Sequence, residues 1–238
     1  IRLIDLATHT SGLPRAIEYP TDEGAPPKEP RTEQATVAAL AANAPLFPAG
    51  TGALYSNFAF DLLGIALGNA AGKPFADVLA ERVLAPAGLT DTLVALRPGD
   101  AARLMLGHDF DGQEIPDVPS PPVKAGSGSL YSTPNDILKW LGWHMDRFAP
   151  ADAEVRILDH AAYVFRAELK PVLGLDESGE MDAMALGWVV MTAEGGRPLI
   201  LQKAGGFAGT FVYAAFAPAK GVGAFVAINK FDFGTATE

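Results

Sequence analysis

Apolar positions in the first half of the chain recur at helical spacing. From Phe58 to Ala71 they return at the spacing of one helix face, Asn57 stands where an N-cap would, and Gly72 provides a stop. This pattern predicts a helix over that range. Equivalent patterns predict two further helices. One runs from Glu33 to Ala42 and follows Thr32, and the other runs from Pro74 to Ala85 and is ended by Pro86 and Gly88.

The segment from Tyr19 to Arg31 has no such period. It contains four prolines and several charges, which favours an irregular but ordered surface loop over a helix or a strand. We expect this loop to line a cleft.

Another helix is predicted to begin within Ser132-Thr133-Pro134-Asn135-Asp136. A hydroxyl cap, a proline in the first turn and an acidic residue near the positive end of the helix dipole are typical of a helix start. A further helical stretch is expected around Asp152 to Glu168. The apolar face of the first of these helices would consist of Ile137, Leu138, Trp140, Leu141 and Met145.

The C-terminal part of the chain switches to the two-residue period of strands, with turns at Glu194 to Arg197 and at Ala217 to Gly221. Helices followed by hairpin-linked strands imply an α+β fold with an antiparallel sheet. We expect a mainly helical region over residues 1–131 and helices followed by strands over residues 132–238, together forming one domain. The predicted strands are Ala185 to Ala193, Pro198 to Lys203, Thr210 to Phe216 and Val222 to Asn229.

Composition and charge exclude several classes of protein. An apolar share of 49% over 238 residues allows a substantial core, yet no apolar stretch approaches the roughly 18 residues of a membrane-spanning helix. The net charge of −10 would repel a phosphate backbone, so nucleic acid is not an expected partner. Cysteine is absent, which excludes disulfides and thiolate metal sites. The four histidines lack ligand-pair spacing, so we expect neither a metal nor another cofactor.

Tyr55 is the first candidate for chemistry. It follows a glycine-rich loop and precedes a predicted helix, so its phenol could project into a cleft as a proton shuttle. A phenol with a pKa of about 10 is a poor base at neutral pH, so this role needs nearby cations that favour the phenolate or relay the proton. An isolated Tyr-x-Asn sequence is otherwise more often a core tyrosine whose hydroxyl bonds to the backbone.

Lys203-Ala204-Gly205-Gly206 is the second candidate. Lys203 would end a strand, and the glycines would let a substrate backbone approach and pair along the strand edge. The N–H of Gly206 could then donate to an oxyanion. By itself, a lysine before two glycines is more often a strand end followed by a turn.

Together with their flanking sequences, these motifs resemble the class C β-lactamase and penicillin-binding-protein family in order and spacing, over nearly the whole chain. The residues from Tyr55 to Leu63 and Leu186-Gly187-Trp188-Val189 are most similar to its AmpH-type D-alanyl-D-alanine carboxypeptidase/endopeptidase branch. The resemblance implies a β-lactamase/transpeptidase-like fold, with the site between a helix-flanked antiparallel sheet and a helical region. The segments that carry it are Ile1 to Pro14, Tyr55-Ser56-Asn57, Gly126-Ser127-Gly128 leading to Asp136, and Lys203 to Gly206.

The resemblance also implies roles for single residues. Tyr55 would act in proton transfer, and Asn57 would hydrogen-bond the substrate amide. Lys203 would hold positive potential near the tyrosine and the substrate carboxylate, while Gly206 would offer an oxyanion N–H.

Two departures from the family pattern matter. The family's acylated serine belongs to a Ser-x-x-Lys element, and no serine here has a lysine three residues later. Because the chain opens on Ile1 without an initiator methionine, we expect the natural N-terminus, the N-terminal strands and the nucleophile helix to lie upstream. This partial chain should then be inactive alone. The second departure is Ala204, which with Gly205 would line the substrate site and stands where the family usually has threonine. A lost hydrogen bond to a charged carboxylate costs about 1.5–3 kcal/mol.

The implied function is serine acyl transfer on D-alanyl-D-alanine or related muropeptide bonds through an acyl-enzyme, with weak β-lactam hydrolysis. Peptidoglycan peptides or β-lactams would be the partners and the periplasm the compartment. Two alternatives stay open. Ala204 favours a carboxylesterase of the same fold, and the missing serine favours an inactive binding or scaffold protein.

Overall fold

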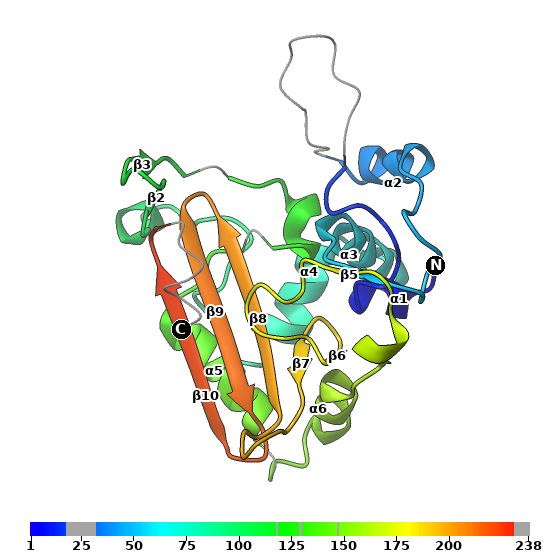
Figure 1. Cartoon of the computed structure of the whole chain (residues 1–238). Helices are drawn as coiled ribbons and strands as arrows, with labels where there is room; N and C mark the ends of the chain where they lie inside the picture. The colour runs from blue at the N-terminus through cyan, green and yellow to red at the C-terminus, as the bar shows by residue number, and fades with distance from the viewer. Residues whose placement is uncertain (18–31, 118, 129, 147, 231–238) are drawn as a thin grey trace.

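A six-stranded antiparallel sheet organises the structure, and helices cover its back and one flank (Figure 1). The computed structural model describes residues 1–17, 32–117, 119–128, 130–146 and 148–230. The strand order is β10-β9-β8-β7-β6-β4. Three long strands, β8 (Ile200–Phe207), β9 (Thr210–Ala217) and β10 (Val222–Ile228), make one half of the sheet. Three short strands, β4 (Val164–Phe165), β6 (Ala183–Met184) and β7 (Val189–Met191), make the other.

Helix α5 (Pro134–Met145) packs on the back of the long strands, against β9 and β10. The remaining helices lie beside the sheet, on the side of its short strands (Figure 1). They are α1 (Leu3–Ala7), α2 (Glu33–Ala42), α3 (Asn57–Ala71), α4 (Phe75–Leu79) with the π-helical turn Ala80–Leu84, and α6 (Ala153–His160). Short 3₁₀ turns occupy Asp100–Arg103, Pro122–Gly126 and Arg166–Glu168. No helix in the described ranges is both long and apolar enough to span a bilayer.

This arrangement confirms the α+β fold with an antiparallel sheet and helices around it. The helices expected at 33–42, 58–71, 74–85 and after Thr133 are all present. The loop expected at 19–31 lies outside the described residues, and the expected division after residue 131 stays a prediction.

The N-cap of α3 was wrongly predicted. Asn57 is the first helical residue, and Ser56 is the cap, because its Oγ accepts a hydrogen bond from the N–H of Ala59 at 2.9 Å. The predicted stop is confirmed, since Gly72 adopts a left-handed φ of 70°.

On α5, Leu138 does not belong to the apolar face. This residue is 51% exposed, because the helix lies on the sheet through a narrower stripe that includes the buried Leu141. The helical stretch expected at 152–168 is correct only for its first half. After His160 the chain joins the sheet, where the N–H of Tyr163 donates to the carbonyl of Met184 at 2.9 Å. Sheet pairing therefore overrides the local helical pattern.

Two strand predictions also need correction. The segment expected as one strand at 185–193 begins with the turn that follows β6, where Gly187 has a φ of 79°, and only Val189–Met191 within it is a strand, β7. The strand expected to end at Lys203 continues to Phe207, because a two-residue turn at Ala208-Gly209 joins β8 directly to β9.

Besides β4 and β6, four two-residue strands outside the main sheet were not predicted, because such short segments show no period. β1 (Ala53–Leu54) pairs in parallel with β5 (Val172–Leu173). β2 (Gly107–His108) and β3 (Glu114–Ile115) form a small hairpin. The first pair matters for the site, because it fixes the residue that follows β1 against the loop that follows β5.

Candidate active site

Two segments far apart in the sequence form one structural unit at the start of α3. The carbonyl of His9 accepts the N–H of Leu54 at 2.9 Å, and the carbonyl of Arg15 accepts the N–H of Asn57 at 2.9 Å. The Oγ of Ser56 also donates to the carbonyl of Pro14 at 2.7 Å. The first family-like segment therefore holds the second in place. On the other side, the N–H of Tyr55 donates to the carbonyl of Leu173 at 3.0 Å.

This unit meets β8 through a group of four aromatic and basic side chains. The buried imidazole of His9 lies between the rings of Tyr55 and Phe60, at centroid distances of 4.8 and 4.7 Å. Its Nε2 is 3.3 Å from the Nζ of Lys203. The same Nζ lies 4.4 Å from the centroid of the Tyr55 ring. Tyr55 and Lys203 are thus brought together, as the sequence predicted.

Burial is the largest cause of the pKa shifts of Tyr55 and Lys203. It raises the pKa of Tyr55, an effect that outweighs the opposite influence of the Arg15 guanidinium. It lowers the pKa of Lys203 to about 8, with the Arg15 guanidinium acting in the same direction. The phenol is therefore protonated at neutral pH. A protonated Tyr55 can relay a proton but is not a phenolate base, so its raised pKa favours the first of these two roles.

The edge of β8 beyond Lys203 is open. β8 pairs with β9 up to Phe207, but with β7 only from Ile200 to Gln202. Phe207 and Thr210 are the pair next to the two-residue turn. In such a hairpin every second residue of the strand hydrogen-bonds to its partner, so the backbone groups of Phe207, Gly205 and Lys203 point to β9. The backbone groups of Ala204 and Gly206 consequently face away from β9, on the side that no described strand occupies. This is the placement required of an oxyanion donor at Gly206.

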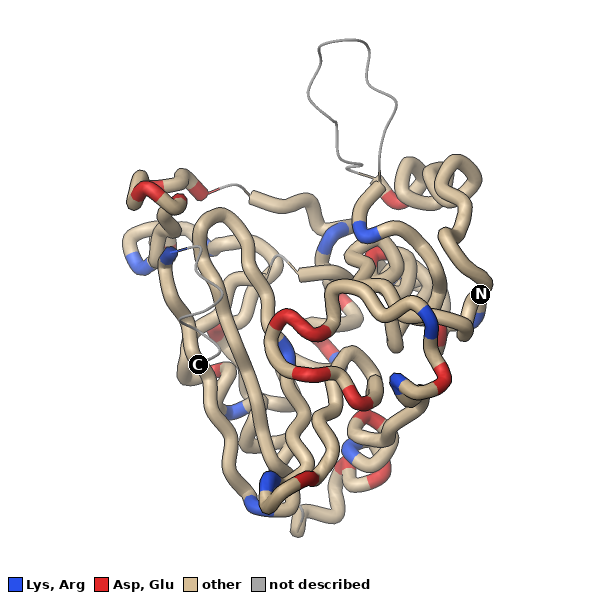
Figure 2. The backbone as a smooth tube through the Cα atoms, viewed as in Figure 1, with Lys and Arg blue, Asp and Glu red and all other residues tan. Residues whose placement is uncertain are grey.

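All six residues predicted for the site line one cavity of about 770 Å³ between the α3 unit and β8. Arg15 and Glu177 line it too, and both were missed from the sequence. The guanidinium carbon of Arg15 is 4.9 Å from the Tyr55 ring centroid, and an Arg15 nitrogen is 3.8 Å from Glu177 Oε1. Figure 2 shows that acidic positions gather on the loop between β5 and β6, which carries Glu177. Predicted site residues in the cavity are Tyr55, Asn57, Lys203, Ala204, Gly205 and Gly206.

The cavity floor depends on a close contact between α3 and the 3₁₀ turn at 122–126. A Cβ on Gly126 would lie 2.2 Å from the carbonyl oxygen of Phe60, so only glycine fits there. Next to it, Lys124 pairs with the buried Asp61 at 3.0 Å, and Ser127 lines the cavity. Ser127 and Gly128, from one of the segments that carry the family resemblance, thus belong to the cavity wall.

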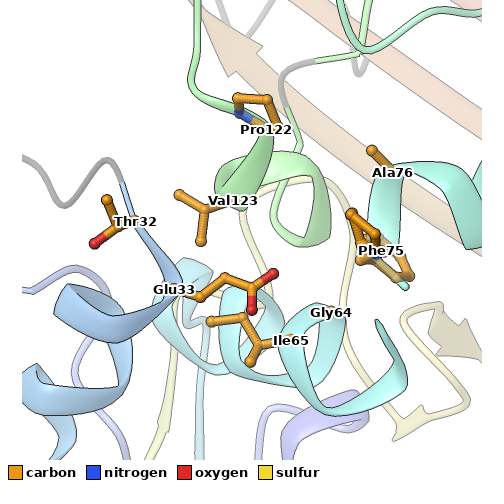
Figure 3. Close-up of a pocket in the computed structure, with 9 residues that line it drawn as sticks. Thr32, Glu33, Gly64, Ile65, Phe75, Ala76, Pro122 and Val123 are labelled. Atoms are coloured by element: carbon orange, nitrogen blue, oxygen red, sulfur yellow. The ribbon is translucent and has the colours of Figure 1, made fainter. Parts of the chain in front are cut away.

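A second, smaller pocket of about 260 Å³ opens between α2, α3 and the turn at 122–126 (Figure 3). Its lining is mostly apolar, with Ile65, Phe75 and Val123, and Glu33 is the acidic side chain among its lining residues. None of the predicted site residues lies there.

A cluster of His144, Asp159 and His160 lies apart from both pockets, between α5 and α6. The two imidazoles contact each other directly, since His144 Nδ1 is 2.9 Å from His160 Nε2. Trp188 Nε1 donates to Asp159 Oδ2 at 3.1 Å. Burial raises the pKa of Asp159 to about 6 and lowers that of His144 to about 3. We interpret this cluster as a hydrogen-bond network that joins the two helices to the sheet.

The fold is of the β-lactamase/transpeptidase type. A solved class C beta-lactamase superposes with a TM-score of 0.73 at 19% identity, over 97% of this chain and 64% of that chain. The beta-lactamase family profile matches residues 1–237, and the protein belongs to that family.

The relatives place the chain more closely within the family. It is 37% identical over 237 residues to the D-alanyl-D-alanine-carboxypeptidase/endopeptidase AmpH of Escherichia coli K12, covering 97% of this chain and 58% of AmpH. It is 36% identical to a beta-lactamase/D-alanine carboxypeptidase from Yersinia pestis, solved with citrate, with a TM-score of 0.82 over 97% of this chain and 64% of that one. The resemblance inferred from the motifs, including its AmpH-type branch, is thus confirmed. The chain spans less than two thirds of the length of either relative.

Proposed function

We propose that this chain carries the substrate-binding and proton-transfer part of a serine hydrolase of the penicillin-binding type. The observation that carries the proposal is the convergence of Tyr55, Lys203 and the free Gly206 edge of β8 around one cavity of about 770 Å³. Proton transfer and oxyanion stabilisation are the two functions that acyl transfer requires besides a nucleophile.

In this proposal an extended peptide lies along the open edge of β8. Its scissile carbonyl oxygen points at the N–H of Gly206, and Asn57 hydrogen-bonds a substrate amide. A serine oxygen attacks the carbonyl carbon, the serine proton passes by way of Tyr55 to the leaving amine, and the C–N bond breaks. Water then hydrolyses the resulting ester. The proposal assigns the serine to chain outside this sequence, because no serine here has a lysine three residues later.

The substrate class we propose is D-alanyl-D-alanine or a related muropeptide bond, with β-lactams as analogues. The name of the AmpH relative and the AmpH-like motifs support this choice. Arg15 and Lys203, both cavity residues, supply the positive potential that a C-terminal carboxylate needs. Peptidoglycan, and with it the periplasm, would be the setting.

Intact-mass spectrometry of the full-length protein after incubation with benzylpenicillin tests the proposal. We expect a covalent penicillin adduct, with the acylation rate at least about 100-fold lower in Tyr55→Phe and Lys203→Ala because proton transfer is lost. Two matched variants far from the cavity, Tyr163→Phe and Lys220→Ala, should acylate at the normal rate. Unchanged acylation in both cavity variants would reject the assigned roles. An unmodified wild-type mass would favour a binding or scaffold protein.

A carboxylesterase of the same fold is the second candidate, and Ala204 is the observation that favours it. Without the threonine hydroxyl, a substrate carboxylate loses a hydrogen bond, whereas a plain ester does not. If the enzyme is a peptidase, Ala204→Thr should raise kcat/KM for D-alanyl peptides by about tenfold and leave short acyl esters unaffected. A wild-type preference for short esters over D-alanyl peptides would decide for the esterase.

A further inference from the structure

His9 is a buried titratable side chain to which the proposed reaction assigns no role. Its backbone has a φ of 58°, a conformation that is uncommon outside glycine, and its side chain is enclosed by Tyr55, Phe60 and Lys203. Only 2% of the residue is exposed. Strained backbone of this kind persists where the surrounding structure holds it, and it clusters at functional sites.

The hydrogen bonds of His9 fix where its proton sits. The backbone N–H of Ser56 donates to Nδ1 at 3.1 Å, and a backbone amide has no other role than donor. Nδ1 must therefore present its lone pair, and a neutral imidazole then carries its proton on Nε2. Turning the ring over would put carbon atoms at both contacts and lose both hydrogen bonds. Burial holds the pKa of His9 well below its usual value, so the imidazole is neutral.

It follows that an N–H of His9 points at Lys203, with Nε2 and Nζ 3.3 Å apart. An ammonium group has three donors and no acceptor, so it cannot receive this hydrogen bond. A neutral amine has one lone pair and can. We propose that His9 is a positioning residue that stabilises the neutral amine form of Lys203 in the unliganded cleft.

The surroundings of Lys203 agree with this assignment. The titratable and charged groups that face it are His9 from the segment after α1, Tyr55 from the connection between β1 and α3, and Arg15 from the loop after His9. The carboxylate of Glu177 faces Arg15 instead, with its Oε1 3.8 Å from an Arg15 nitrogen. Within the described residues, Lys203 forms no ion pair with a carboxylate. Burial and the Arg15 guanidinium lower the pKa of Lys203 in the direction that the His9 contact requires.

Stabilisation of the neutral amine makes the positive charge of Lys203 depend on whether a ligand is bound. When an anionic ligand enters, the amine can take one proton from the solvent, release the His9 N–H and face the ligand as an ammonium. This inference concerns the protein without substrate. It stands or falls independently of the acyl-transfer reaction proposed above.

NMR of the unliganded full-length protein, with ¹⁵N-labelled histidine and ¹³Cε-labelled lysine, tests the proposal. We expect His9 to show the Nε2–H tautomer in long-range ¹⁵N–¹H spectra. The Cε signal of Lys203, assigned by its loss in Lys203→Arg, should titrate at or below pH 8. His9→Phe keeps an aromatic ring between Tyr55 and Phe60 but removes the donor, and we expect it to raise that midpoint by at least about one unit.

His160→Phe serves as the matched control, because His160 is a partly buried histidine remote from the cavity. It should leave the Lys203 titration unchanged. An Nδ1–H tautomer in the wild-type protein would overturn the proposal, and this result does not depend on any variant folding. A folded His9→Phe protein with an unchanged Lys203 midpoint would overturn it as well, since a residue that only fills space would behave in that way.

Discussion

Single residues in this site serve the fold and the chemistry together, and Ser56 is the clearest case. Its hydroxyl caps α3 through the N–H of Ala59 and donates to the carbonyl of Pro14, while its backbone N–H orients His9. Ser56→Ala should lower the free energy of unfolding by about 2 kcal/mol, because a cap is lost and the partly buried carbonyl of Pro14 is left without its donor. Urea unfolding measures this. The exposed cap of α2, removed by Thr32→Ala, should cost about half as much, and equal losses would contradict the argument.

Lys203 illustrates the opposite relation, in which a functional side chain costs stability. Its pKa falls from an ordinary value of about 10.4 in the unfolded chain to about 8 in the fold, so between these values the unfolded state binds more protons. The contribution of Lys203 to the free energy of unfolding therefore becomes more favourable as pH increases from 8 to about 10.4. Lys203→Met removes the cost of burying the charge and should raise the free energy of unfolding by about 2–3 kcal/mol at pH 7. The difference in free energy of unfolding between this variant and the wild type should be smaller at pH 10. Thermal unfolding at both pH values tests this, with the exposed-turn variant Lys220→Met as the control.

The sequence identified Tyr55, Asn57, Lys203 and Gly206 because each falls on a family motif, and the structure lines one cavity with all four. It did not identify His9 or Arg15 as neighbours of Lys203. Local pattern carries no information that residue 9 meets residue 203, and a left-handed φ at a histidine cannot be inferred from spacing. His9 stood within a motif, but sequence reasoning considered it only as a metal ligand.

At the scale of elements, long segments were predicted well and short ones were not. The long helix α3 and the strands β8 to β10 repeat their periods often enough to be recognised. Two-residue strands such as β1 have no period at all. The end of α6 is set by the pairing of the following residues with β6, and the end of β8 by its tight turn to β9. The open edge of β8, on which the proposed substrate lies, is thus a property of the sheet and not of the strand.

Close packing of α3 on the turn at 122–126 gives the element-scale prediction. The three atoms nearest to a Cβ on Gly126 would be backbone atoms of Phe60 and Asp61, at 2.2 to 3.1 Å, so the backbone must move to admit it. Gly126→Ala should therefore destabilise the protein by about 1–3 kcal/mol and weaken acylation with it. Gly142 on α5 has nothing within 4 Å of its Cβ position, and Gly142→Ala should stabilise by about 0.5–1 kcal/mol. Urea unfolding of the pair checks both signs, and destabilisation by both would show that steric contact is not the cause.

At the scale of the whole molecule, contacts across residue 131 are extensive. β1 pairs with β5, the N–H of Gly187 donates to the carbonyl of Ala7 at 2.9 Å, and the N–H of Asp91 donates to Asp136 at 2.7 Å. The candidate site itself joins Tyr55 to Lys203. A helical part and a strand-rich part were foreseeable from the change of period, but their interleaving was not, because only the folded chain brings these residues together.

We therefore expect the two parts to unfold as one cooperative unit. All three tryptophans lie after residue 131, so their fluorescence reports on the sheet and α5. The chain has no cysteine, so a single Ala70→Cys on the exposed end of α3 can carry a dye that reports on the helical part alone. Both probes should give the same urea midpoint, and it should coincide with that of far-UV circular dichroism in unlabelled protein. Separate midpoints would mean that the contacts across residue 131 are too weak to couple the two parts, and that the Tyr55 and Lys203 walls of the cavity belong to different folding units.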